Sequence, residues 1–309
     1  MKKLAISTIR AAGHVAMMPV ERSLMANGSK ASPPVFIIGA PRSGTSLLYE
    51  LMITRFRFAY MSNAAHRFYR TPLTASRLFR GTIREWEGNF TSKYGHIDGW
   101  GAPNEGGWIW QRWLADGDWR DADGFGDASK DQLRRLTAGL ETILGGPFLN
   151  KNVMHSNRLR LMDAIWPDAL FVEVKRDVLD NARSIVRAER VEAGPDKHGD
   201  IWWSVRPKLA SSYAGKPDTE RAIAQVIGVE RDIAEDVQAI GSERLLSVDY
   251  SEMCAAPEAA LSRIRDFAEA RGCTLQDRGT APDKFPVRPS KPMSDADEAS
   301  LQDVLSRFR

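Results

Sequence analysis

The stretch FIIGAPRSGTS, residues 36–46, decides the fold of this chain. It completes a short apolar run that begins at Val35, which predicts a buried strand over residues 35–38. Gly39 and Gly44 bound a tight loop, and residues 46–55 have the pattern of a helix. A strand, a glycine-containing loop and a helix N-terminus in this order form a cradle of backbone N–H groups that binds an anion.

The side chains of the loop suit the same anion. Ser43, Thr45 and Ser46 supply hydroxyl donors, and Arg42 supplies a fixed charge that can fork onto phosphate oxygens. The two glycines have the spacing of the nucleotide-binding pattern GxxxxGK[ST], but Thr45 stands where that pattern has lysine. That lysine normally reaches the β- and γ-phosphates beside magnesium, so its absence argues against an NTPase or a kinase.

Outward from the loop, strand and helix signals alternate along the chain. The order predicts an α/β protein with a three-layer P-loop-like fold, in which a central parallel sheet is flanked by helices. Ligands of such sheets bind at the carboxyl ends of the strands. The predicted strands are 35–38, 56–61, 146–150, 170–174 and 244–248, and the predicted helices are 46–55, 156–166, 179–189, 219–240 and 257–271.

Residues 62–146 interrupt this alternation with many glycines and few clean periodicities. They predict a tryptophan-rich helical insertion within a single domain that spans residues 1–309. Aromatic walls suit sugars, sterols, phenols and acyl chains equally, so the insertion is expected to cover an acceptor. The alternative is that the tryptophans fill the core of a small helical subdomain. They are Trp86, Trp100, Trp108, Trp110, Trp113 and Trp119.

Composition narrows the class of ligand and the compartment. A formal net charge of +3 suits a small polyanion better than a nucleic acid, so no nucleic-acid partner is expected. Cys254 and Cys273 cannot build a disulfide framework or a zinc site, which indicates the cytoplasm. In the N-terminal arm, residues 1–30, the apolar run 4–9 is too short for a signal or a membrane span. A plain helix is expected there, with weak membrane-surface contact as the alternative.

The motif PRSGTS, residues 41–46, resembles the 5′-phosphosulfate loop of sulfotransferases that use 3′-phosphoadenosine-5′-phosphosulfate (PAPS). The likeness covers residues 33–61 and 146–270. It implies that Arg176, after a predicted strand, and Ser184, eight residues later, hold the 3′-phosphate of PAPS. Eight residues are about two helical turns, so both side chains can face one ligand. The resemblance likewise implies that the phosphosulfate end is bound by Arg42, Ser43, Gly44, Thr45 and Ser46.

The resemblance also implies the reaction. The sulfuryl group of PAPS passes by in-line displacement to a hydroxyl of a small-molecule, glycan or lipid-like acceptor, and no metal is required. Lys151, 25 residues before Arg176, corresponds to a strand-end lysine that faces the sulfuryl group. Arg42 and Lys151 are then placed to stabilise the charge that develops during transfer.

The sequence departs from the cytosolic members of the family in two places. Leu47 stands where those members have an aromatic residue that stacks on adenine, so the adenine partner is not identified. The C-terminal Arg-Lys-Gly segment is missing, and Arg288 and Lys291 are weak candidates to replace it at the 3′-phosphate.

The general base is left open among four residues. Glu105 ranks first because residues 101–105 resemble a Pro-x-Glu segment of some bacterial members, and His66 follows because it comes after a predicted strand. His155 and His96 rank below them. For each of the four, the alternative is a polar residue at the surface or the core edge that has no chemical role.

Two rival functions remain. A small-molecule P-loop kinase would need the loop lysine and a magnesium-binding aspartate. A non-catalytic nucleotide-binding relic would be expected to have lost charges that this chain retains at Arg42, Lys151 and Arg176, and Ser184 is present as well.

Overall fold

A parallel sheet lies at the centre of the protein, whose computed structural model describes residues 16–27, 32–92, 95–114, 122–193, 202–287 and 289–308. Within these residues the sheet has four strands in the order β2-β1-β3-β4, all parallel. The predicted central parallel sheet is confirmed. The strands are β1 (Val35–Ile38), β2 (Leu149–Lys151), β3 (Leu170–Lys175) and β4 (Leu245–Asp249).

The register of the strands brings three strand ends to one edge. Val35 of β1 pairs with Leu149 of β2 on one side and with Leu170 of β3 on the other. All four residues of β1 are buried, as expected for a parallel strand covered on both faces. The carboxyl ends of β1, β2 and β3 therefore lie side by side and position whatever follows each strand.

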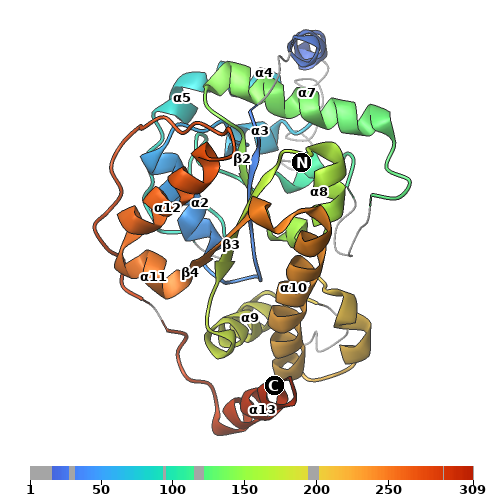
Figure 1. Ribbon diagram of the computed structural model, residues 1–309, viewed down its shortest axis with the longest axis vertical. Coiled ribbons are helices and arrows are strands. Elements are labelled where there is room, and N and C mark those ends of the chain that lie inside the picture. Colours follow the sequence, from blue (N-terminus) through green and yellow to red (C-terminus); the bar gives the residue numbers. More distant parts are fainter. Residues whose placement is uncertain are drawn as a thin grey trace, which may run out of the picture.

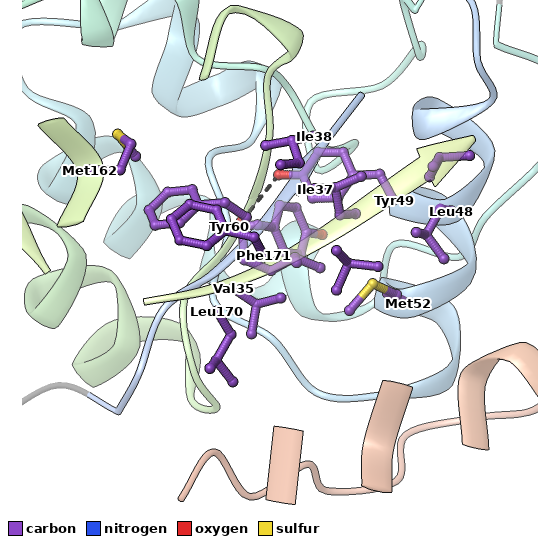
Figure 2. Packing of buried hydrophobic residues seen from close by; sticks show 14 of the residues in the cluster. Val35, Ile37, Ile38, Leu48, Tyr49, Met52, Tyr60, Met162, Leu170 and Phe171 are labelled. Carbon is purple, nitrogen blue, oxygen red and sulfur yellow. Dashed lines mark hydrogen bonds between the residues drawn. The ribbon is translucent and has the colours of Figure 1, made fainter. Parts of the chain in front are cut away.

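Helices cover both faces of the sheet, so the predicted three-layer arrangement is confirmed (Figure 1). On one side lie α2 (Thr45–Arg55) and α12 (Pro257–Glu269). On the other lie α8 (Leu159–Ile165) and α10 (Asp218–Ile240). Figure 2 shows Leu48 and Met52 of α2 beside the strand residues, with Met162 of α8 across the sheet. Burying each such side chain stabilises the fold by about 1.5–3 kcal/mol.

The strand predicted over residues 56–61 does not form, so the sheet has one strand fewer than expected. Ala59 alone makes a parallel bridge, to Phe148, while Phe56 makes an antiparallel bridge to Asp277. Ser62 is bridged to Pro103, which has no N–H with which to extend a ladder. The segment is buried because it packs beside the sheet edge, and its apolar pattern reflects that burial.

The helical insertion is confirmed over the described part of residues 62–146. Trp110 is 1% exposed in the core whereas Trp100 and Trp108 are exposed, so these tryptophans do not share one role. Trp119 lies outside the described residues. The helices are α3 (Asn63–Arg67), α4 (Pro72–Leu78), α5 (Arg80–Arg84), α6 (Gly107–Trp110) and α7 (Asp127–Leu144).

The remaining elements follow the predictions closely in the middle of the chain. The helix expected over residues 156–166 begins at Leu159, because residues 153–157 form a 3₁₀ turn in which the Asn152 side chain accepts from the Met154 N–H. The C-terminal helix α13 was not predicted. These elements are η1 (Val153–Asn157), α9 (Val178–Ala193), η2 (Lys208–Tyr213), η3 (Ser242–Arg244), α11 (Tyr250–Ala255) and α13 (Asp295–Arg307).

The described part of the N-terminal arm is helical over residues 16–26. Buried Glu21 accepts hydrogen bonds from the Leu73 and Thr74 N–H groups, which are unpaired donors at the start of α4. This contact fixes the helix on the insertion. Residues 1–15 of the arm, which contain the apolar run 4–9, lie outside the described residues, and membrane-surface contact of the arm stays an untested alternative. Within the described residues, no helix has the length and apolar character needed to cross a bilayer.

Candidate active site

The loop between β1 and α2 has positive φ angles and close backbone approaches that require glycine at two positions. Gly39 and Gly44 have φ values of 139° and 107°, in the region that favours glycine. A Cβ on Gly39 would lie 2.7 Å from the Val174 carbonyl oxygen, and one on Gly44 would lie 2.4 Å from Tyr250 Cδ2. Arg42 is left-handed as well, with φ of 67°. Such a conformation costs about 1–3 kcal/mol in a non-glycine residue and is typical of functional loops.

Side chains from outside the loop hold this shape. The buried Ser156 hydroxyl accepts from the Gly39 N–H at 3.0 Å and donates to the Gly39 carbonyl at 3.1 Å. The Asn181 amide, with its nitrogen turned toward the loop, donates to the Pro41 carbonyl at 2.7 Å and to the Arg42 carbonyl at 3.1 Å. The loop is therefore preorganised by residues of η1 and α9.

A cavity of about 880 Å³ opens at this loop, and we call it the loop cavity. Aromatic rings form part of its wall, among them Trp202, Trp203 and Tyr250. Ser43 does not line it. The Ser43 hydroxyl lies inside the turn, buried and without a hydrogen-bond partner among the described residues. The predicted site residues that line the loop cavity are Arg42, Gly44, Thr45, Ser46, Glu105, Lys151, Arg176 and Ser184.

The predicted second anchor meets the loop directly. Arg42 Nε donates to the Ser184 hydroxyl at 3.2 Å, and Arg176 Nη1 donates to the Arg42 carbonyl at 3.1 Å. The Tyr250 ring packs between Gly44 and the Arg176 guanidinium, whose Cζ lies 4.7 Å from the ring centroid. One wall of the loop cavity thus carries two guanidiniums and a hydroxyl, a donor set that fits a phosphate.

Lys151 and Glu105 form an ion pair at another part of the same cavity. The Lys151 side chain is 3% exposed and the Glu105 side chain is 36% exposed, so the carboxylate is the member of the pair that solvent reaches. A Cβ placed on Gly95 would lie 3.3 Å from Glu105 Oε1, 3.5 Å from Ser46 Oγ and 3.6 Å from Lys151 Nζ. An acid, a hydroxyl and an amine therefore surround one point.

The main chain of Glu105 is held in place by hydrogen bonds from nearby side chains. Its carbonyl accepts from Trp110 Nε1 at 2.9 Å and from Asn150 Nδ2 at 3.3 Å. The insertion thereby delivers a carboxylate to the end of β2, which is a contact between residues 46 positions apart.

None of the three candidate histidines lines the loop cavity. His66 stacks on Trp108, with ring centroids 4.5 Å apart. His155 is fully buried beside Asn150 and Trp110, and burial lowers its pKa well below the ordinary value. His96 is exposed, 3.3 Å from Asp98. Geometry favours Glu105 over these residues, and the identity of the base stays a prediction.

Glu50 lines the loop cavity and was not predicted. It is 1% exposed; Oε2 accepts from the Phe90 N–H at 2.8 Å, while Oε1 has no hydrogen bond of standard geometry among the described residues. Burial raises its pKa, and the charge of Lys151 acts in the opposite direction. The sequence did carry a signal, because Glu50 is an acid four residues after Ser46 in an otherwise apolar part of a helix.

Two further basic residues, Arg187 and Lys291, line the loop cavity. Arg187 comes three residues after Ser184, on the same face of α9. Arg288, predicted together with Lys291, lies outside the described residues. Among the described residues, no three His, Cys, Asp or Glu side chains gather as a set of metal ligands.

Comparison with known proteins adds a family to this geometry. Residues 33–271 match the family model described as the sulfotransferase family. Among solved structures, sulfotransferase STF9 from Mycobacterium avium is similar, with a TM-score of 0.52 and 16% identity over 92% of this chain and 70% of that chain. Sulfotransferase STF1 from Mycobacterium tuberculosis H37Rv gives a TM-score of 0.49 and 16% identity over 90% and 72%. No curated protein matches the sequence. At such identities the structural likeness shows the fold alone.

Proposed function

Because the chain belongs to the sulfotransferase family, we propose that it transfers the sulfuryl group of PAPS to an acceptor hydroxyl. One observation carries the proposal: Lys151, Glu105 and Ser46 converge in a cavity that also holds Arg42 and Arg176. The acceptor class remains as predicted, a small molecule, a glycan or a lipid-like alcohol.

The two ends of the donor call for different residues. At the 3′-phosphate, Arg176 supplies a guanidinium fork and Ser184 a hydroxyl, and their contacts with Arg42 support a shared ligand. At the 5′ end, the N–H groups of the loop, the N-terminus of α2 and the hydroxyls of Thr45 and Ser46 face an anion. The fit rests on the chemistry of these donors.

The transfer exchanges one bond to sulfur for another, and the protein supplies a proton acceptor and positive charge. A bond forms between the acceptor oxygen and sulfur, while the bond between sulfur and the bridging oxygen breaks and its electron pair goes to the phosphate of the leaving adenosine 3′,5′-bisphosphate. Glu105 takes the proton of the acceptor hydroxyl. Lys151 and Arg42 stabilise the negative charge that grows on the oxygens around sulfur. The products are a sulfate ester, the bisphosphate and a proton.

Calorimetry with adenosine 3′,5′-bisphosphate tests the donor. We expect metal-independent binding that Arg176→Ala weakens by about 1.5–3 kcal/mol, since a charged hydrogen bond is lost. Arg77→Ala, an exposed arginine on α4, is the matched control and should bind as wild type. ATP with magnesium is titrated in parallel.

The outcomes separate the rival functions. A preference for ATP with magnesium would favour the kinase, and binding of the bisphosphate without consumption of PAPS in an acceptor screen would favour the relic. Equal loss in Arg176→Ala and Arg77→Ala would overturn the assignment of Arg176.

A further inference from the structure

A second cavity of about 850 Å³ adjoins the loop cavity, and we call it the arginine cavity. Phe90 lines both. The apolar wall of the arginine cavity includes Phe58, Tyr60 and Trp86, and its charged residues include Arg57 and Arg84. Its wall is therefore amphipathic, with rings on one part and guanidiniums on another.

A row of polar residues on α2 connects the two cavities. Ser46, Glu50 and Thr54 are spaced by four residues and so share one helix face. The first two line the loop cavity and Thr54 lines the arginine cavity. Their separation along the helix is about 12 Å, at about 1.5 Å per residue. A ligand that follows this face would extend from the Lys151–Glu105 pair to the arginines.

Two atoms in this row are buried polar groups without a standard hydrogen bond. Thr54 Oγ1 has no hydrogen bond among the described residues, and Glu50 Oε1 has none of standard geometry, although the Asn89 N–H also lowers the pKa of the Glu50 carboxyl. Buried acceptors and hydroxyls are almost always hydrogen-bonded in folded proteins, so each such exception needs a ligand or water to explain it. Both belong to the α2 face whose residues line one cavity or the other.

Phe90 stands where the cavities meet. Its N–H is held by Glu50, its ring packs on Phe285 at 5.0 Å between centroids, and its φ is 53°. A left-handed phenylalanine is strained, and such strain persists where the surroundings impose it. The contact with Glu50 fixes the ring as a shared wall of both cavities.

Positive charge accumulates at the far end of the arginine cavity. A Cβ on Gly145 would lie 3.5 Å from Arg84 Nη2 and 3.6 Å from Arg57 Cδ, so the two side chains flank one glycine. Arg80 lies one turn before Arg84 on α5. Burial lowers the pKa of Arg84, and the charges of Arg80 and Arg57 lower it further.

No carboxylate among the described residues forms an ion pair with Arg57 or Arg84. Both arginines are exposed, and Arg84 donates to the Leu144 and Ile143 carbonyls at the end of α7. Glu85 and Glu87 also line the cavity, but both are exposed and neither pairs with these arginines. Clustered guanidiniums without a counter-charge favour an oxyanion from outside the chain.

We propose that the arginine cavity binds the anionic end of an elongated acceptor, with a carboxylate at Arg57 and Arg84 and a hydroxyl that reaches Glu50 and Glu105. The proposal rests on the proposed function, because the hydroxyl end is placed by the sulfuryl site. The apolar body of the acceptor lies against Phe58, Trp86 and Phe90. An acceptor with these three parts is an amphipathic hydroxy acid.

The test is calorimetry with 12-hydroxydodecanoate and with its neutral match, dodecane-1,12-diol, below the concentration at which either aggregates. The protein is wild type, Arg57→Gln or Arg77→Gln, each saturated with adenosine 3′,5′-bisphosphate. We expect wild type and Arg77→Gln to bind the acid about ten- to a hundredfold more tightly than the diol. Arg57→Gln should bind the two alike, with unchanged affinity for the bisphosphate.

Every other result contradicts a specific part of the proposal. Equal binding of acid and diol by wild type, or a preference for the acid that survives Arg57→Gln, would overturn the carboxylate site. Binding of the bisphosphate without binding of either alcohol would overturn the acceptor cavity and leave the donor proposal intact. If the bisphosphate does not bind, the proposed function fails, and an Arg57-dependent preference for the acid would still identify an anion site.

Discussion

The loop cavity and the arginine cavity share Phe90 but differ in how their cations are held. In the loop cavity, Arg42 bonds to Ser184 and Lys151 pairs with Glu105, so the positive groups have partners within the chain. In the arginine cavity, Arg84 donates only to backbone carbonyls, and neither Arg57 nor Arg84 forms an ion pair with a described residue. Under the proposals above, the first cavity would hold the donor, and the second would receive its negative charge from the acceptor.

The two cavities also differ in their origin in the chain. The loop cavity is assembled at strand ends, where the fold fixes position within a residue or two. The arginine cavity is assembled from the end of α2, from α5, from the end of α7 and from the segment after α12 that contains Arg278. Arg278 connects these parts by donating to the carbonyls of Ile53, Arg84 and Trp86.

Gly44→Ala should separate the cavities most strongly. A left-handed alanine costs about 1–2 kcal/mol, and displacing the Tyr250 ring costs about 1–3 kcal/mol more. We expect a lower free energy of unfolding in urea and a large loss of affinity for adenosine 3′,5′-bisphosphate. The affinity for 12-hydroxydodecanoate should change little, because Gly44 does not line the arginine cavity.

Gly124→Ala is the matched control for backbone strain. Gly124 has φ of 76° and nothing within 4 Å of the added Cβ, so only the left-handed cost applies. If both variants lose the same stability, Tyr250 does not set the shape of the loop.

Lys151→Met should affect turnover without affecting either ligand's binding much. Removing a charge that stabilises the transition state typically lowers kcat by about 10²–10³-fold. Turnover of PAPS with an acceptor from the screen gives kcat, and calorimetry gives the affinity for the bisphosphate. Lys216→Met, at an exposed turn, should match wild type. A fall in donor affinity as large as the fall in kcat would make Lys151 a binding residue.

Glu230→Gln should have the smallest effect and should leave both cavities unchanged. Burial, followed by repulsion from Glu173, raises the pKa of Glu230 to about 7. Because the folded state holds this proton more tightly than the unfolded state, wild type loses stability as pH rises from about 4.5 to about 7.

The glutamine side chain cannot ionise, so the stability of the variant does not fall in this way as pH rises. It should exceed wild type at pH 8 by about 1–2 kcal/mol, less than the full shift because the group is partly solvated, and should equal it near pH 4. Urea unfolding at both pH values measures the difference, and Glu269→Gln, an exposed acid on α12, serves as the control. A difference of the same size at both pH values would exclude ionisation as its cause.

Several features could be predicted because neighbouring residues encode them. The β1 run, the glycines at 39 and 44 and the start of α2 specify the loop through local backbone preferences and burial. The family resemblance singled out Arg176 and Ser184, and their positions after β3 and on α9 let both line one cavity. The apolar run at 56–61 misled for the opposite reason, because burial beside a sheet and pairing within it give the same pattern.

By itself the sequence determined the strand–loop–helix segment around Gly39 and Gly44, the parallel sheet and the basic residues at strand ends, since each depends on contiguous residues. Only the tertiary structure decided that Glu105 meets Lys151, that Glu50 holds Phe90, and that Arg57 and Arg84 flank Gly145. These contacts join segments whose approach depends on how the insertion, of which α7 is part, packs against α2. No local periodicity encodes that packing, because its free energy comes from burial shared among distant side chains.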